Sequence, residues 1–151
     1  MIQTPDGKRL NGNLKPSRFS ASGFVGNDTR PVEEIIRDDL QSLENMGITI
    51  TSLVSSLKKA HSSAQAAFGA QVIIRGNITA TYYESRGTIL SPFRKDGRFP
   101  KGETRISDST TGESIRVTSL GINLIERHGF FQGKGSPYRI EPFSAVRLLG
   151  L

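Results

Sequence analysis

The 151-residue chain contains no cysteine and no tryptophan. Without cysteine it can build neither a disulfide framework nor a cysteine-ligated zinc or iron–sulfur site, and it has no thiol nucleophile. Its two histidines, His61 and His128, lie too far apart in the sequence to show a recognisable metal-ligand spacing. We therefore expect a protein that holds no metal and no cofactor.

Long apolar runs are also missing. No segment approaches the roughly 18 apolar residues that a membrane-spanning helix needs, and residues 1–19 lack the apolar stretch of a secretory signal. Hydrophobic residues make up only 35% of the chain, but they recur at regular spacing in several segments, which is typical of a folded domain. These features predict a soluble cytoplasmic protein with one domain and no membrane partner.

Positive charge is in excess and unevenly placed. The formal net charge is +6; residues 1–70 hold 8 basic and 7 acidic side chains, whereas residues 71–151 hold 12 and 7. A basic excess favours polyanionic partners, because binding releases the counterions condensed on the polyanion. The alternative is a modest positive charge that only keeps the protein soluble.

The first half of the chain predicts a basic arm followed by two helices. Residues 1–28 are rich in glycine and asparagine and show no apolar period, so we interpret them as an arm. A first helix is expected from a cap at Asp28 or Thr29 to Gly47, with Pro31 in its first turn. Its apolar stripe consists of Val32, Ile35, Ile36, Leu40 and Leu43.

A second helix is expected from a cap at Thr49 or Thr51 to Gly69. Its apolar face consists of Leu53, Val54, Leu57, Ala60, Ala64, Ala67 and Phe68. His61 lies near that face and is expected to be a partly buried core residue. The pair has the spacing of a DNA-binding helix-turn-helix, but the first helix is strongly acidic and the second offers only Lys58 and Lys59 as cations. An ordinary αα-hairpin is the favoured interpretation.

The second half predicts short strands around a third helix. The pattern indicates one or two strands over 71–83, in which Gly76 either turns a hairpin or marks a bulge. A strand over 88–90, a long loop over 91–104 and a hairpin over 105–117 are expected next. A helix from Thr118 or Ser119 to Gly129, a strand over 137–140 and a last helix opened by Pro142 follow. The last helix is expected to carry Phe143, Val146 and Leu149.

The predicted fold is α+β: an N-terminal αα-hairpin followed by a small, mostly antiparallel sheet with one inserted helix. A single domain is expected over 29–151, divided into a helix pair (29–69) and a strand-rich basic half (70–151).

The segment 86–105 is the first candidate site. Its six cations are interleaved with two phenylalanines and only two acidic residues, a pattern that can grip phosphates while stacking on bases. The predicted contacts are Arg86, Phe93, Arg94, Lys95, Arg98, Phe99, Lys101 and Arg105. The alternative is a solvated surface loop in which both phenylalanines turn back as anchors.

The segment 126–142 is the second candidate. Lys134 and Arg139 are expected to extend the anion-binding surface if this loop lies beside the first. Gly-Lys-Gly-Ser at 133–136 is not a Walker nucleotide loop, because position 128 is His and the stretch follows a helix instead of a strand. A winged helix, with the loop as its wing, stays open.

The preferred function is a non-enzymatic module that binds a polyanion, above all DNA or RNA. The first alternative is a small enzyme that acts on an anionic substrate at the His128–Arg139 loop. In that enzyme His128 would be the general base, with Glu126 or Glu141 as its carboxylate partner. The second alternative is an assembly component that orders on a partner protein or in a homo-oligomer. No residue pattern identifies a reaction, so we expect no enzyme activity.

Overall fold

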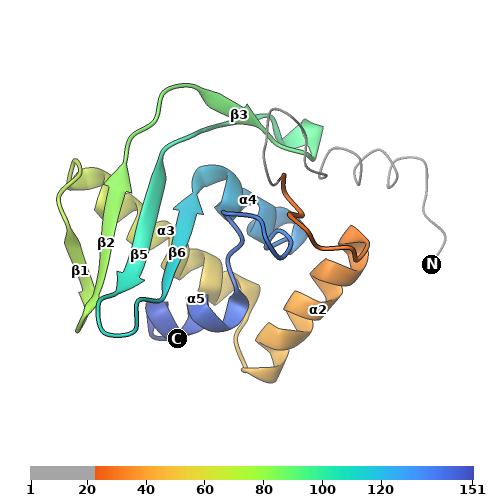
Figure 1. Cartoon of the computed structure of the whole chain (residues 1–151), viewed down its shortest axis with the longest axis horizontal. Coiled ribbons are helices and arrows are strands. Elements are labelled where there is room, and N and C mark those ends of the chain that lie inside the picture. The colour runs from red at the N-terminus through yellow and green to blue at the C-terminus, as the bar shows by residue number, and fades with distance from the viewer. Residues whose placement is uncertain (1–22) are drawn as a thin grey trace.

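Residues 23–151, the part of the chain that the computed structural model describes, form an antiparallel sheet with helices packed on one face (Figure 1). The helices are α2 (Val32–Asn45), α3 (Ile50–Ala66), α4 (Ser119–His128) and α5 (Pro142–Leu149), with a short 3-10 helix η1 (Arg94–Asp96). The strands are β1 (Val72–Arg75), β2 (Ile78–Tyr83), β3 (Thr88–Leu90), β4 (Arg98–Pro100), β5 (Glu103–Asp108) and β6 (Ser114–Thr118). The predicted α+β class, with a helix pair before a mostly antiparallel sheet, is confirmed.

Helix α2 begins without the side-chain cap that the sequence predicts. Its N-cap is Pro31, and the Asp28 carboxylate instead accepts hydrogen bonds from Arg30 and from the backbone N–H of Lys134. Val32, Ile35 and Leu43 are buried as expected, but Leu40 is 37% exposed and contributes less to the stripe. Glu33 and Glu34 lie in the first turn. Their negative charges stabilise the helix because they interact favourably with the positive end of its dipole.

Helix α3 lies along the sheet and supplies much of the core. Thr49 caps it as predicted, because the Thr49 side chain accepts a hydrogen bond from the Ser52 backbone N–H at 3.1 Å. The buried face runs from Leu53 to Ala64 and includes His61. The prediction for Phe68 was wrong: it lies beyond the helix end, is 94% exposed and has a φ of +50°. The chain makes a left-handed turn there to reach β1, and the turn points the ring outward.

The four-stranded sheet has the order β1-β2-β5-β6, and all its neighbours are antiparallel. Of the two interpretations of Gly76, the hairpin turn is the correct one: it joins β1 and β2, whose register is irregular between Ile73 and Arg75. Alternate residues of β2, among them Ile78 and Tyr82, face the helices and are buried. The other side of each strand is more exposed, so the sheet has one core face and one outer face.

The prediction of a long loop over 91–104 was wrong. Strands β3 and β4 pair there, with Ile89 opposite Phe99, and η1 closes the tip. Gly97 permits this tight return with a φ of +83°. This second hairpin continues β2 and β5 past a bend, and it arches over α4 in Figure 1. We call residues 84–102 the ribbon.

The segment between α4 and α5 contains turns instead of the strand predicted over 137–140. Helix α4 begins at its predicted cap, Thr118, and ends at Gly129 in the left-handed conformation, with a φ of +64°. Beyond it, the Ile140 N–H donates to the Phe131 carbonyl and the Arg139 N–H to the Ser136 carbonyl. Residues 137–140 therefore form turns and pair with no strand of residues 23–151. A winged helix requires a strand at this point, so the fold is not a winged helix.

Two apolar clusters hold these elements together. The larger lies between the sheet and the helices α3, α4 and α5, and contains Leu57, Ile106 and Leu148. The smaller joins α2 and α4 around Phe130, and Phe93 and Phe99 of the ribbon pack against it. In α5 the buried residues are Pro142, Ala145 and Leu148, whereas Phe143 is 63% exposed.

Residues 24–27 pack against the loop 133–136. The Gly133 N–H donates to the Phe24 carbonyl at 2.8 Å and the Asn27 N–H to the Lys134 carbonyl at 3.0 Å. The approach is so close that a Cβ on Gly133 would lie 2.3 Å from the Val25 carbonyl oxygen. The rest of the predicted arm, residues 1–22, lies outside the described part of the chain. Within 23–151, no helix is both long and apolar enough to cross a membrane.

Candidate nucleic-acid interface

The tip of the ribbon is anchored on α4. The Phe93 ring stacks on the His128 ring, with centroids 3.6 Å apart and planes 7° apart, and meets Phe130 edge-on. Asp96 hydrogen-bonds His128 Nε2 at 2.7 Å and accepts a bond from Asn123 Nδ2 at 2.8 Å. These contacts join a hairpin tip to a helix that lies some thirty residues further along the chain, so the ribbon has a defined position.

The same contacts set the protonation of the Asp96 carboxyl. Its side chain is only 6% exposed, and burial by itself raises the pKa of a carboxyl. The hydrogen bonds from His128 and Asn123 and the nearby Arg127 guanidinium outweigh burial, so the pKa of Asp96 is lowered. An ionised Asp96 thus holds the tip to α4.

Five cations on the ribbon have no carboxylate partner. They are Arg86, Arg94, Lys95, Arg98 and Lys101, all exposed. None lies within ion-pair distance of a carboxylate of residues 23–151. The eight cations that do pair in this part of the chain are Arg30, Arg37, Lys58, Arg105, Arg116, Arg127, Arg139 and Arg147. Arg98 has only a long hydrogen bond, 3.4 Å, to the Thr88 hydroxyl.

The two phenylalanines of the ribbon are anchors in this structure. Phe93 has one face against His128 and its edge near Phe130, and Phe99 is half-buried against the same cluster. This is the arrangement that the alternative interpretation of segment 86–105 describes. Their rings hold the ribbon in place, so the cations are presented on a fixed scaffold.

The remaining predicted contacts lie in three different settings. Arg105 lies on the outer face of the sheet beside Glu103, at 3.3 Å. Lys134 is exposed on the 133–136 loop. Arg139 differs from the prediction. Its side chain is 8% exposed, forms ion pairs with Asp39 and Glu141, and donates a hydrogen bond to the Gln132 carbonyl. Because these acceptors occupy its guanidinium, Arg139 does not extend an anion-binding surface.

The two histidines have separate environments. His61 is buried in the core, as expected, with Nδ1 2.7 Å from the Thr104 hydroxyl. His128 does reach a carboxylate, but it is that of Asp96. The two predicted partners are engaged elsewhere, Glu126 with Lys58 and Glu141 with Arg139. Among residues 23–151, no three acidic or histidine side chains gather in a way that would hold a metal ion.

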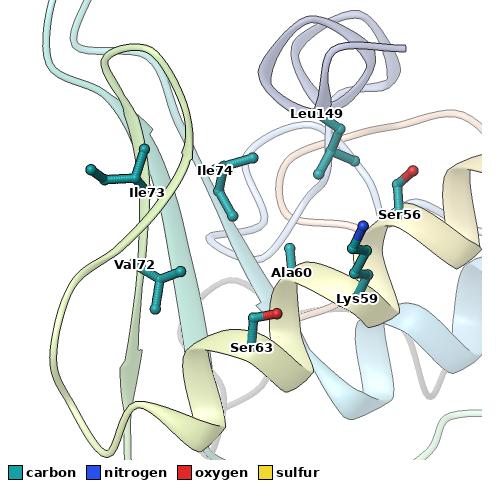
Figure 2. A pocket seen from close by; sticks show the side chains of 8 residues that line it. All are labelled: Ser56, Lys59, Ala60, Ser63, Val72, Ile73, Ile74 and Leu149. Carbon is teal, nitrogen blue, oxygen red and sulfur yellow. The ribbon is translucent and has the colours of Figure 1, made fainter.

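A groove of about 270 Å³ lies at the sheet edge, between β1 and α3 (Figure 2). Its apolar wall consists of Val72, Ile74 and Leu149, and Lys59 reaches along its α3 side. Ile73, between the two strand residues, points away from the groove in Figure 2. One cation among apolar side chains does not make a phosphate site, and the groove lies away from the ribbon.

Sequence reasoning missed the residues that surround Arg105. Arg116 lies directly opposite it on β6, and the Arg105 guanidinium lies 4.6 Å from the centre of the Tyr83 ring. Period-two alternation in the predicted strands already places Tyr83 on the side of Thr79 and Thr81, away from the core. The sequence does not show that β2 pairs with β5, because this pairing requires the ribbon to fold back. Comparison with protein-family models, curated proteins and solved structures finds no match to this chain.

Proposed function

We propose that the protein is a non-enzymatic module that binds nucleic acid through the basic ribbon. The observation that carries this proposal is the concentration of five exposed cations on residues 86–101 that pair with no carboxylate of residues 23–151, whereas most other arginines in that part of the chain are ion-paired. A cation without a carboxylate partner loses no ion pair when it meets a phosphate, and each such contact releases condensed counterions.

The distribution of acidic residues supports the same orientation. Of the five acidic residues of α2, Asp39 is buried against Arg139, whereas Glu33, Glu34, Asp38 and Glu44 lie at the surface of a helix at the lower right of Figure 1. A polyanion is repelled from α2 and attracted to the ribbon, so the field of the molecule favours one side for the encounter.

The first prediction concerns a triple variant with Arg94→Gln, Lys95→Gln and Arg98→Gln. Each lost phosphate contact is expected to reduce the slope of log affinity against log salt by about one. The slope of log affinity against log salt should therefore be shallower by about three in the triple variant. The variant should also bind more weakly than the parent between about 50 and 200 mM salt. Fluorescence anisotropy with labelled DNA and RNA oligonucleotides measures both quantities.

The matched control removes the same charge from the helices, with Arg37→Gln, Lys58→Gln and Lys59→Gln. All three side chains are exposed, and two of them have only surface ion pairs, which contribute about 0–1 kcal/mol. We expect this control to bind nearly as the parent does. Equal losses in both variants would mean that net charge alone drives binding, and an unchanged ribbon variant would refute the proposal.

A further inference from the structure

The outer face of the four-stranded sheet is a second surface with the chemistry of a nucleic-acid site. Helices α3, α4 and α5 contact the sheet on its opposite face, and α2 packs against α5 (Figure 1). We call the residues that point outward the open sheet face: Ile73, Thr79, Thr81, Tyr83, Glu103, Arg105, Ser107, Ser114, Arg116 and Thr118. Hydroxyl groups dominate it, and Glu103 is its sole carboxylate.

Two arginines meet on β5 and the edge strand β6 of this face. Arg105 and Arg116 are direct cross-strand partners, an arrangement that like charges normally disfavour. Glu103 lies 3.3 Å from the first guanidinium and 3.6 Å from the second. One carboxylate therefore serves two guanidinium groups, and the face keeps an uncompensated positive charge that an incoming phosphate can neutralise.

Each of these arginines places its guanidinium over a tyrosine ring, within cation–π range. The Arg105 guanidinium lies 4.6 Å from the Tyr83 ring centre, and that of Arg116 lies 5.8 Å from the Tyr138 ring centre. The Tyr138 hydroxyl donates to Glu103 Oε1 at 3.3 Å, which ties both stacks to one carboxylate. Tyr83 is 46% exposed, so part of its ring is open to solvent. Unpaired bases stack on aromatic rings and on guanidinium planes alike.

The size of the face fits a short single strand. Three inter-strand spacings separate β1 from β6, which is about 14 Å. Four-stranded sheets that bind RNA stack two or three bases on such a face. A duplex buries its base faces and offers nothing to these stacks, whereas a single strand exposes them.

We propose that the open sheet face binds single-stranded nucleic acid, with Tyr83 and Arg105 as the platform for one base. Arg116 and Tyr138 receive the neighbouring base, and the ribbon, which continues β2 and β5 past the bend, holds the phosphates beyond it. This proposal rests on the nucleic-acid function proposed for the ribbon and specifies its substrate as unpaired strands.

The test compares Tyr83→Ala with Tyr83→Phe on single-stranded oligouridylate, single-stranded oligothymidylate and a duplex. Loss of a stacking ring should weaken single-strand binding about five- to hundredfold, with the salt slope and the duplex affinity unchanged. Tyr83→Phe keeps the ring and should bind as the parent does. Phe143→Ala removes another exposed aromatic, from α5 on the helical side, and should have no effect.

The ribbon triple variant separates this proposal from the one on which it rests. If Tyr83→Ala binds single strands like the parent while the ribbon variant is weakened, the sheet proposal is overturned and the ribbon proposal stands. If the parent binds no nucleic acid, both are overturned. Ultraviolet cross-linking of bromouridine oligonucleotides to the unmodified protein gives a readout that needs no variant. A cross-link at Tyr83 or Tyr138 is expected, and cross-links confined to the ribbon or helices would overturn the sheet proposal.

Discussion

At the scale of single residues, His61 makes the stability of the folded protein depend on pH. Its Nδ1 lies 2.7 Å from the Thr104 hydroxyl, but its Nε2 is buried and has no hydrogen-bond partner among residues 23–151. Burial lowers the pKa of His61 below its ordinary 6.5, so below pH 6.5 the unfolded chain takes up a proton that the folded core resists. The free energy of unfolding should therefore fall with pH from about 6.5 downward, by up to about 1.4 kcal/mol per pH unit.

Urea unfolding of His61→Asn at a series of pH values checks this. Asparagine can keep a polar contact to Thr104 but does not titrate, so its stability should lack the fall that begins near pH 6.5. Parallel pH profiles for parent and variant would contradict the role of His61.

The contacts of Arg139 could not be predicted from the sequence. Its acceptor, Asp39, lies 100 positions away, and no local pattern links the two residues.

At the scale of elements, one buried ion pair fastens α2 to the segment before α5. The Asp39 and Arg139 side chains are 6% and 8% exposed and share two hydrogen bonds of 2.8 Å. Removal of one partner leaves a buried charge, so Asp39→Asn should cost about 3–5 kcal/mol. The double variant Asp39→Leu with Arg139→Met leaves no charge behind and should recover much of that loss.

A double-mutant cycle by chemical denaturation measures the coupling between these two residues. Lys58→Gln serves as the control, because it breaks an exposed pair with Glu126 that is worth about 0–1 kcal/mol. A cost for Asp39→Asn no larger than that of the control would show that the pair does not hold α2 in place.

Elements with strong local signals were predictable from the sequence. The helix caps at Thr49 and Thr118 and the turn at Gly76 depend on residues within a few positions of one another. The ribbon and the segment 137–140 depend on distant partners instead. Asp96 finds its hydrogen bonds on α4. In the segment 137–140, Tyr138 bonds Glu103 and Arg139 bonds Asp39.

At the scale of the whole molecule, charge is sorted by environment. The sequence places the basic excess in residues 71–151, but only the fold separates paired from unpaired cations. Arg139 and Arg147 hold carboxylates on α2 and on the β5–β6 hairpin, whereas the ribbon cations face solvent. Net charge was therefore predictable, and the surface that uses it was only partly so, because Tyr83 and Arg116 join it through strand pairing.

The buried, paired carboxyls predict how the stability of the fold changes at acid pH. Three carboxyls join distant segments: Asp28 bonds Arg30 and the Lys134 backbone, Asp96 bonds His128, and Asp108 bonds Thr110 and Arg147. These contacts lower the pKa of all three below the ordinary 3.8. Their stabilisation is thus complete above pH 3.8 and is lost as pH falls through the lower, folded-state values.

We expect a second fall in stability below about pH 4, separate from the one that His61 causes. These carboxylates have side chains at most 9% exposed, so salt should screen them little. Raising salt from about 0.1 M to about 1 M should shift the acid transition only slightly while it abolishes binding to the ribbon. Circular dichroism during acid titration at both salt concentrations measures the transition. An acid midpoint as sensitive to salt as nucleic-acid binding would mean that surface repulsion, and not these three carboxylates, drives acid unfolding.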